Sequence, residues 1–127
     1  MTILLLNYTH PLTDAQRAQV AALAGDQLEI RDIGVQIDRA RPLAEAAVEL
    51  AEAAGLAPAD WQTRSLLVNP PGLAPLALAL IAELHGRSGH FPAILNIRPL
   101  AEATPPRYEV AETVNLQALR DAARGRR

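Results

Sequence analysis

Three asparagines in this chain follow short apolar runs, and a proline comes within four residues of each one. Asn7 follows residues 3–6, Asn69 follows residues 66–68, and Asn96 follows residues 93–95. An asparagine amide can bind the edge of adenine, a ribose hydroxyl or a phosphate, because it carries both donors and an acceptor. We predict that the three side chains form the polar floor of a ligand site. The alternative is that each asparagine only ends a strand and starts a turn.

The residues that flank these asparagines complete the predicted ligand-binding set. The set comprises Asn7, Tyr8, Thr9, His10, Asn69, Pro70, Pro71, Gly72, Leu73, Asn96 and Arg98. Because proline has no backbone N–H, Gly72 and Leu73 would be the donors at the start of the helix expected there. Arg98 follows a central strand, where it is suited either to bind a phosphate or to form a structural salt bridge.

His10 is the candidate for acid–base chemistry, with Tyr8 beside it, because imidazole titrates near neutral pH. His85 at a helix end and His90 in a loop are expected to be structural. The histidines lack the spacing of a metal site, and the sequence contains neither a glycine-rich phosphate loop nor a serine nucleophile elbow. We therefore predict neither a metal nor a cofactor.

Composition limits the classes of protein to which the chain can belong. With 127 residues, 50% of them hydrophobic, it is expected to form one domain over residues 1–127. A net charge of −2 gives no general attraction to duplex nucleic acid. The absence of cysteine fits a reducing cytoplasm, and no apolar run has the length of a membrane span. Residues 3–6 are read as a core strand rather than as part of a signal peptide.

All 12 basic residues are arginines, and four of them lie in the last eight positions. We interpret this tail as a solvated helix end, with contact to a polyanionic partner as the alternative.

The periodicity of apolar residues predicts the elements that position the candidate site. Strands are expected at residues 3–7, 28–37 (with a bulge or break near Asp32), 64–69, 93–96 and 108–114. Helices are expected at residues 13–24, 42–54, 73–85 and 116–124. Residues 56–62 are expected to be a connection, in which Trp61 either caps the core or anchors an interface. Strands that alternate with helices predict an α/β fold, a Rossmann-like three-layer sandwich with a mostly parallel sheet. The helix at 73–85 has no polar face, so we expect a second subunit to cover it.

Three segments of the chain together resemble a known group of proteins. They are Asn7-Tyr8-Thr9-His10-Pro11-Leu12-Thr13, Leu67-Val68-Asn69-Pro70-Pro71-Gly72 and Leu95-Asn96-Ile97-Arg98-Pro99. This group is the small CARF-related accessory proteins of type III CRISPR systems, and the similarity extends to residues 107–110 and 116–120. The resemblance implies a homodimeric, CARF-like domain that binds a cyclic oligoadenylate messenger, with cyclic tetra-adenylate as the expected ring. It also allows a higher assembly on ligand binding.

Three functions follow from this resemblance. The first is sequestration of the messenger, which lowers effector activation. The second is cleavage of the ring by a metal-independent ring nuclease, with His10 and Tyr8 as catalytic residues. The third is a nucleotide-responsive regulatory or scaffold subunit. We favour sequestration, because a chain without lysine and with few arginines near the crevice offers little charge stabilisation to a transition state.

Overall fold

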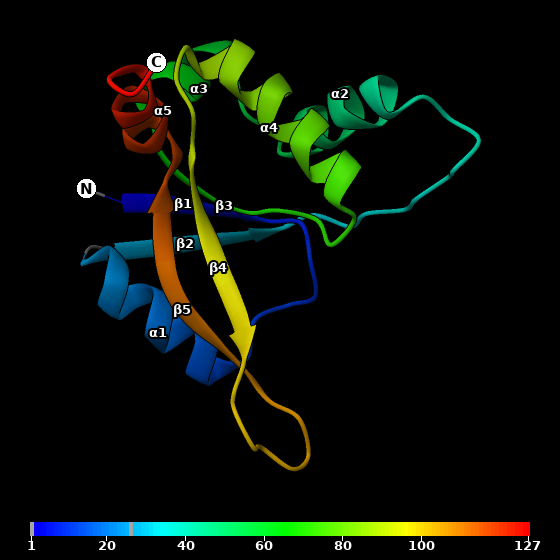
Figure 1. Cartoon of the computed structure of the whole chain (residues 1–127). Coiled ribbons are helices and arrows are strands. Elements are labelled where there is room, and N and C mark those ends of the chain that lie inside the picture. Colours follow the sequence, from blue (N-terminus) through cyan, green and yellow to red (C-terminus); the bar gives the residue numbers. More distant parts are fainter. Residues whose placement is uncertain (1, 26) are drawn as a thin grey trace.

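A computed structural model describes residues 2–25 and 27–127 of the chain (Figure 1). Its sheet contains five strands, which are β1 (Thr2–Asn7), β2 (Gln27–Asp32), β3 (Ser65–Asn69), β4 (Ala93–Pro99) and β5 (Tyr108–Asn115). Their order is β2-β1-β3-β4-β5, and the first four strands run parallel. Only β5, which pairs with β4, is antiparallel. The prediction of an α/β fold with a mostly parallel sheet is confirmed.

Helices cover both faces of this sheet (Figure 1). They are α1 (Asp14–Ala24), α2 (Leu43–Ala53), α3 (Pro58–Thr63), α4 (Ala74–Ser88) and α5 (Leu116–Arg124). Helix α1 packs on one face, whereas α2, α3 and α4 form a layer on the other. The result is a three-layer arrangement compatible with a Rossmann-like fold.

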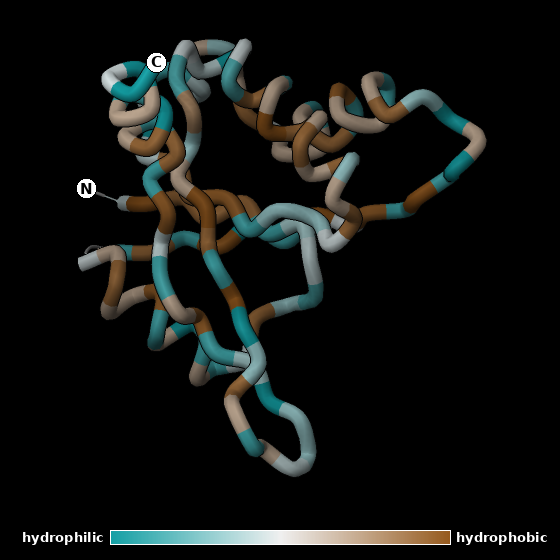
Figure 2. The backbone as a smooth tube through the Cα atoms, in the orientation of Figure 1, coloured by the Kyte–Doolittle hydropathy of each residue, from teal (hydrophilic) through white to brown (hydrophobic). Residues whose placement is uncertain are grey.

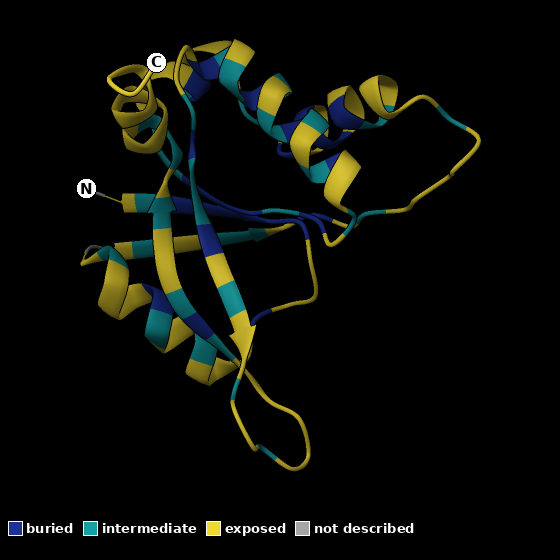
Figure 3. Ribbon diagram, in the orientation of Figure 1, coloured by how far each residue is buried: buried dark blue, intermediate teal, exposed yellow. Residues whose placement is uncertain are grey.

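The apolar runs of the central strands β1 and β3 are buried on both faces of the sheet (Figure 3). Successive side chains of a strand point to opposite faces, so β1 contributes to two cores. Leu4 and Leu6 belong to the core under α2, α3 and α4, together with Trp61. Leu5 belongs to the core under α1, together with Val20. In Figure 2 the hydrophobic stretches accordingly lie in the central strands and along α2 and α4.

Helix α1 begins and ends where its sequence predicts. The Thr13 hydroxyl accepts a hydrogen bond from the Gln16 backbone N–H at 3.2 Å, and the Gln16 side chain accepts one from the Thr13 N–H at 2.9 Å. These two bonds satisfy N–H groups that have no partner within the helix. Gly25 follows the helix with a φ of 70°, a conformation that glycine adopts without strain. The expected capping box and glycine stop are confirmed.

The expected strand at residues 28–37 is wrong in its second half, because β2 ends at Asp32. The backbone N–H of Ile33 donates to the Asn7 carbonyl at 2.8 Å, and after this contact the chain leaves the sheet. The break in alternation near Asp32 therefore marks the end of a strand and not a bulge within one.

Three further elements differ from the expectation by more than one residue. Helix α4, expected to end at residue 85, continues to Ser88. Residues 56–62 contain the short helix α3, which starts at Pro58 and buries Trp61 in the core. The role of Trp61 as a cap on the core is confirmed. Strand β4 continues past Asn96 to Pro99 because β5 pairs along its whole length.

Helix α4 buries only one of its sides in this chain. Leu76, Leu80 and Leu84 lie in the core, whereas Leu78 is 73% exposed. Cover by a second subunit remains a prediction. Among the described residues, no helix combines the length and the hydropathy needed to cross a membrane.

Candidate functional site

The carboxyl ends of β1 and β3 lie side by side at the point where the order of the strands in the sheet reverses. Asn7 and Asn69 are register partners at the ends of these neighbouring strands. The chain leaves β1 toward α1 on one face, and it leaves β3 toward α4 on the opposite face. Because the two connections diverge, they leave a crevice between them. Open parallel sheets bind ligands at such a topological switch point, and the order 2-1-3-4-5 places it between β1 and β3.

The Asn7 amide is the centre of a hydrogen-bond network beneath this crevice. Its Nδ2 donates to the His10 carbonyl at 3.0 Å and to Oδ1 of Asp32 at 2.8 Å. Its Oδ1 accepts from the Thr9 backbone N–H at 3.3 Å and from the Thr9 hydroxyl at 3.0 Å. The side chain is fully buried. Asn7 therefore fixes the loop that follows β1 and ties it to the end of β2.

Asn69 completes the network from the neighbouring strand. Its Nδ2 donates to Oδ1 of Asn7 and to the Thr9 hydroxyl, both at 2.9 Å. Its Oδ1 accepts no hydrogen bond from the described part of the chain. Since no buried side-chain oxygen or nitrogen among the described residues lacks a partner, this oxygen is not enclosed. The two amides thus bind each other, and the Asn69 Oδ1 is the atom that keeps capacity for a ligand. Direct ligand contact by these residues stays a prediction.

A hollow of about 420 Å³ opens between the two connections and the segment after β2. It is lined by residues 8–11, 33–35, Ile37, Pro71 and Gly72. Thr9, His10 and Gly72 are exposed, whereas Pro71 is buried. The wall is therefore largely apolar, with a hydroxyl and an imidazole at its surface.

The Tyr8 phenol is turned away from solvent into the core. Its side chain is 2% exposed, and its hydroxyl donates to the Leu50 carbonyl at 3.2 Å. Burial raises the pKa of the phenol far above its ordinary value, although the nearby Arg87 guanidinium opposes the shift. The hydroxyl is therefore held protonated against α2, and His10 is the titratable side chain at the surface of the hollow.

The connection from β3 to α4 places backbone donors beside this hollow. Pro70 and Pro71 contribute none, and Leu73 is the N-cap of α4. Among the described residues, no side chain caps the start of α4. Gly72, Leu73, Ala74 and Leu76 therefore retain N–H groups that can bind an anion, whereas Pro75 in the first turn has none.

Asn96 and Arg98 lie apart from the other candidate residues. Both are exposed on the β4–β5 hairpin, which projects beyond the rest of the sheet (Figure 1). Asn96 Nδ2 lies 3.4 Å from Oε2 of Glu112, and Arg98 Nε donates to Oε1 of Glu109 at 3.0 Å. The structure thus brings together two of the three asparagines, and Arg98 forms the salt bridge that was one of its two expected roles.

Two parts of this site were missed by the sequence analysis. Asp32 anchors Asn7, and residues 33–37 form one wall of the hollow. The break in alternation at Asp32 was the signal that could have identified both. Within residues 2–25 and 27–127, no group of three or more potential metal ligands occurs.

The chain was compared with protein-family models, curated proteins and solved structures. None of them matches it, so the chemistry of the site is argued from its own residues.

Proposed function

We propose that this protein binds cyclic tetra-adenylate at the switch-point crevice and sequesters it. The observation that carries the proposal is the 420 Å³ hollow between the connections that follow β1 and β3. Adenine nucleotides suit such a place, because a base can pack on the apolar wall while phosphate oxygens accept from the free N–H groups of α4. The resemblance of the three asparagine-containing segments to CARF-related proteins of type III CRISPR systems points to the same ligand.

The size of the hollow favours one nucleotide of the ring for each chain. Small-molecule pockets have volumes of roughly 300–1,000 Å³, and 420 Å³ lies at the low end of this range. A ring of four nucleotides needs more than one such hollow. A CARF-like homodimer with two adjoining crevices would match the two-fold symmetry of the ring. We infer that the cytoplasmic protein acts as this dimer, and that ligand binding can extend it into a higher assembly.

The residues around the hollow favour sequestration over cleavage. Cleavage would require a base for the ribose 2′-hydroxyl, a donor to the leaving oxygen and stabilisation of the charge on phosphorus. His10 can serve as one of these groups, but the Tyr8 hydroxyl is already bound to Leu50. The residues that line the hollow include no arginine. The site therefore holds the ring without the charges that would accelerate its opening.

The test is to mix the protein with labelled cyclic tri-, tetra- and hexa-adenylate. Native gels report the complex, and chromatography reports any linear product. We expect cyclic tetra-adenylate to be retained and to be recovered intact. No retention of any ring would overturn the proposal. Linear products at catalytic protein concentrations would replace sequestration by cleavage, and His10→Ala would then show whether His10 is a catalytic residue.

A pair of glycine variants locates the binding site. A Cβ atom added at Gly72 meets nothing within 4 Å, and the same is true at Gly86, which is exposed on α4. Gly72→Asp therefore adds a negative charge at the hollow without a steric clash, whereas Gly86→Asp adds the same charge elsewhere. We expect Gly72→Asp to weaken binding at least about tenfold, since one like-charge contact is worth more than 1.4 kcal/mol in a partly buried site. Equal binding by the two variants would place the ligand elsewhere.

A further inference from the structure

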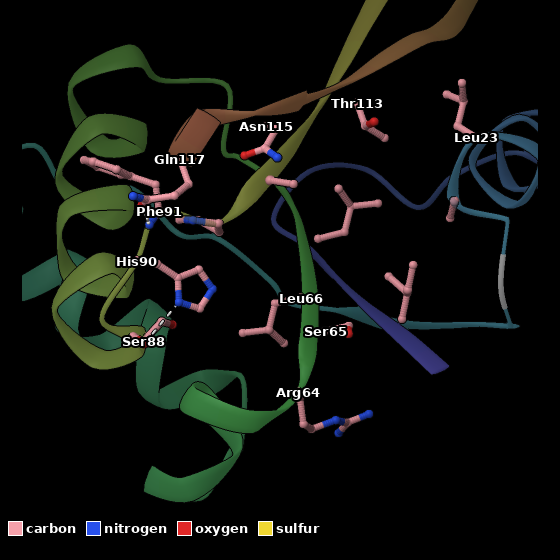
Figure 4. A pocket seen from close by; sticks show the side chains of 15 residues that line it. Leu23, Arg64, Ser65, Leu66, Ser88, His90, Phe91, Thr113, Asn115 and Gln117 are labelled. Carbon is pink, nitrogen blue, oxygen red and sulfur yellow. Dashed lines mark hydrogen bonds between the residues drawn. The ribbon is translucent and has the colours of Figure 1, made fainter. Parts of the chain in front are cut away.

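A second hollow lies at the opposite end of the sheet. Its volume is about 530 Å³, and it opens where β1, β3 and β4 begin and where β5 ends (Figure 4). It shares no lining residue with the hollow at the switch point. The proposed nucleotide site therefore makes no use of it.

Arg64 brings a positive charge to this hollow with most of its hydrogen-bonding capacity unused. Its side chain is only 28% exposed, yet the ion pair that it forms with Glu29 is 3.7 Å long, which is too long for a hydrogen bond. Glu29 is closer to Arg31, at 3.1 Å. Within the described residues, the Arg64 guanidinium donates no hydrogen bond. By contrast, Arg41 donates two to Glu49, each at 2.7 Å.

Two polar side chains from other elements face the same space. The Asn115 Oδ1 caps α5 by accepting from the Ala118 N–H at 2.9 Å. Its Nδ2 donates no hydrogen bond to the described residues. The Nδ1 of His90 lies 3.2 Å from the Ser88 carbonyl. Since a carbonyl only accepts, this nitrogen carries the proton, and Nε2 is left as an acceptor for a donor group of a ligand. Figure 4 shows Asn115 and His90 on two sides of the space and Arg64 on a third.

The remainder of the lining is mainly apolar. Leu66 and Phe91 contribute half-buried hydrophobic surface between the polar side chains. Phe91 is held in place by a ring contact with His85, at 4.2 Å between centroids, and by a hydrogen bond from its N–H to the Gln117 side chain at 2.8 Å. The hollow thus combines one cationic group, two further polar groups and a supported apolar surface.

We propose that this hollow binds a small organic anion, whose carboxylate, sulfonate or phosphate pairs with Arg64 and whose apolar body packs on Leu66 and Phe91. A guanidinium forms its strongest hydrogen bonds with such planar or tetrahedral oxyanions. A volume of 530 Å³ is sufficient for a ligand with one or two rings. The amide of Asn115, on another side of the hollow, supplies a donor to a polar atom elsewhere on the ligand.

The proposal can be tested with two probes that differ in one charged group. The anionic probe is 8-anilinonaphthalene-1-sulfonate, and the neutral probe is N-phenyl-1-naphthylamine, which lacks the sulfonate. Fluorescence titration gives the Kd of each probe for the wild-type protein, for Arg64→Gln and for Arg41→Gln. Arg41 is the matched control, because it lines a different hollow and is occupied by Glu49.

We expect Arg64→Gln to raise the Kd of the anionic probe about tenfold, which corresponds to about 1.4 kcal/mol, and to leave the Kd of the neutral probe unchanged. Arg41→Gln should change neither value. Asn115→Asp, which retains an effective helix cap while adding a negative charge, should also weaken the anionic probe selectively. An unchanged Kd for the anionic probe in Arg64→Gln would overturn the proposal. An equal loss for both probes, or an equal loss in Arg41→Gln, would do so as well.

Discussion

Replacement of Asn69 by alanine tests the network that joins the ends of β1 and β3. The change removes two hydrogen bonds, from Asn69 Nδ2 to Oδ1 of Asn7 and to the Thr9 hydroxyl, both at 2.9 Å. A buried hydrogen bond contributes about 0.5–1.5 kcal/mol to stability. Thr9 still donates to Oδ1 of Asn7, so that oxygen is not left without a partner. We therefore expect Asn69→Ala to lower the free energy of unfolding by about 1–3 kcal/mol.

The matched control is Asn96→Ala, because Asn96 follows the same kind of apolar run and yet lies exposed on the β4–β5 hairpin. Its side-chain hydrogen bond to Glu112 is 3.4 Å long. We expect this change to cost less than about 0.5 kcal/mol, as is typical of surface positions. The two free energies of unfolding are measured by urea denaturation monitored by circular dichroism.

A double-mutant cycle shows whether the loss at Asn69 comes from its contact with Asn7. Asn7→Ala, Asn69→Ala and the double variant should give a coupling energy of about 0.5–3 kcal/mol, as found for residues in one hydrogen-bond network. The reasoning is refuted if Asn69→Ala and Asn96→Ala cost the same, or if the coupling energy is zero. Either result would mean that the two amides do not act together at the switch point.

Two further predictions concern stability. Because burial raises the pKa of Tyr8 above its ordinary value of 10.0, the unfolded chain loses this proton first as the pH rises. The stability that depends on the phenol is thus fully present below pH 10 and is lost above it, by about 1.4 kcal/mol per pH unit. Urea denaturation between pH 9 and 11 should show a steeper loss for the wild type than for Tyr8→Phe, and equal slopes would contradict the burial of the phenol. Thr13→Ala should lower the free energy of unfolding by about 1 kcal/mol, because it removes the cap of α1. Thr63→Ala, at the exposed end of α3, should lower it less. A thermal denaturation series in which Thr63→Ala is the more destabilising change would count against the capping box.

Local sequence is sufficient to predict the features that depend on neighbouring residues. The apolar run of β1 ends at Asn7, the capping box starts α1 at Thr13, and Gly25 stops it. Each of these follows from a preference that acts within four or five residues, such as a hydrogen bond between N-cap and N3 or the freedom of glycine at positive φ. The alternation of strands and helices likewise identified the α/β class.

Which candidate residues lie together depends on long-range strand pairing. Asn7 and Asn69 are 62 positions apart, and only the parallel pairing of β1 with β3 places them side by side. The pairing of β3 with β4 stops at Val68 and Ile94, and Asn96 instead faces Glu112 on β5. The side of the sheet to which Tyr8 points depends on the register of β1, because successive side chains alternate between faces. A local pattern marks where a strand ends, but long-range pairing determines which strand ends lie together.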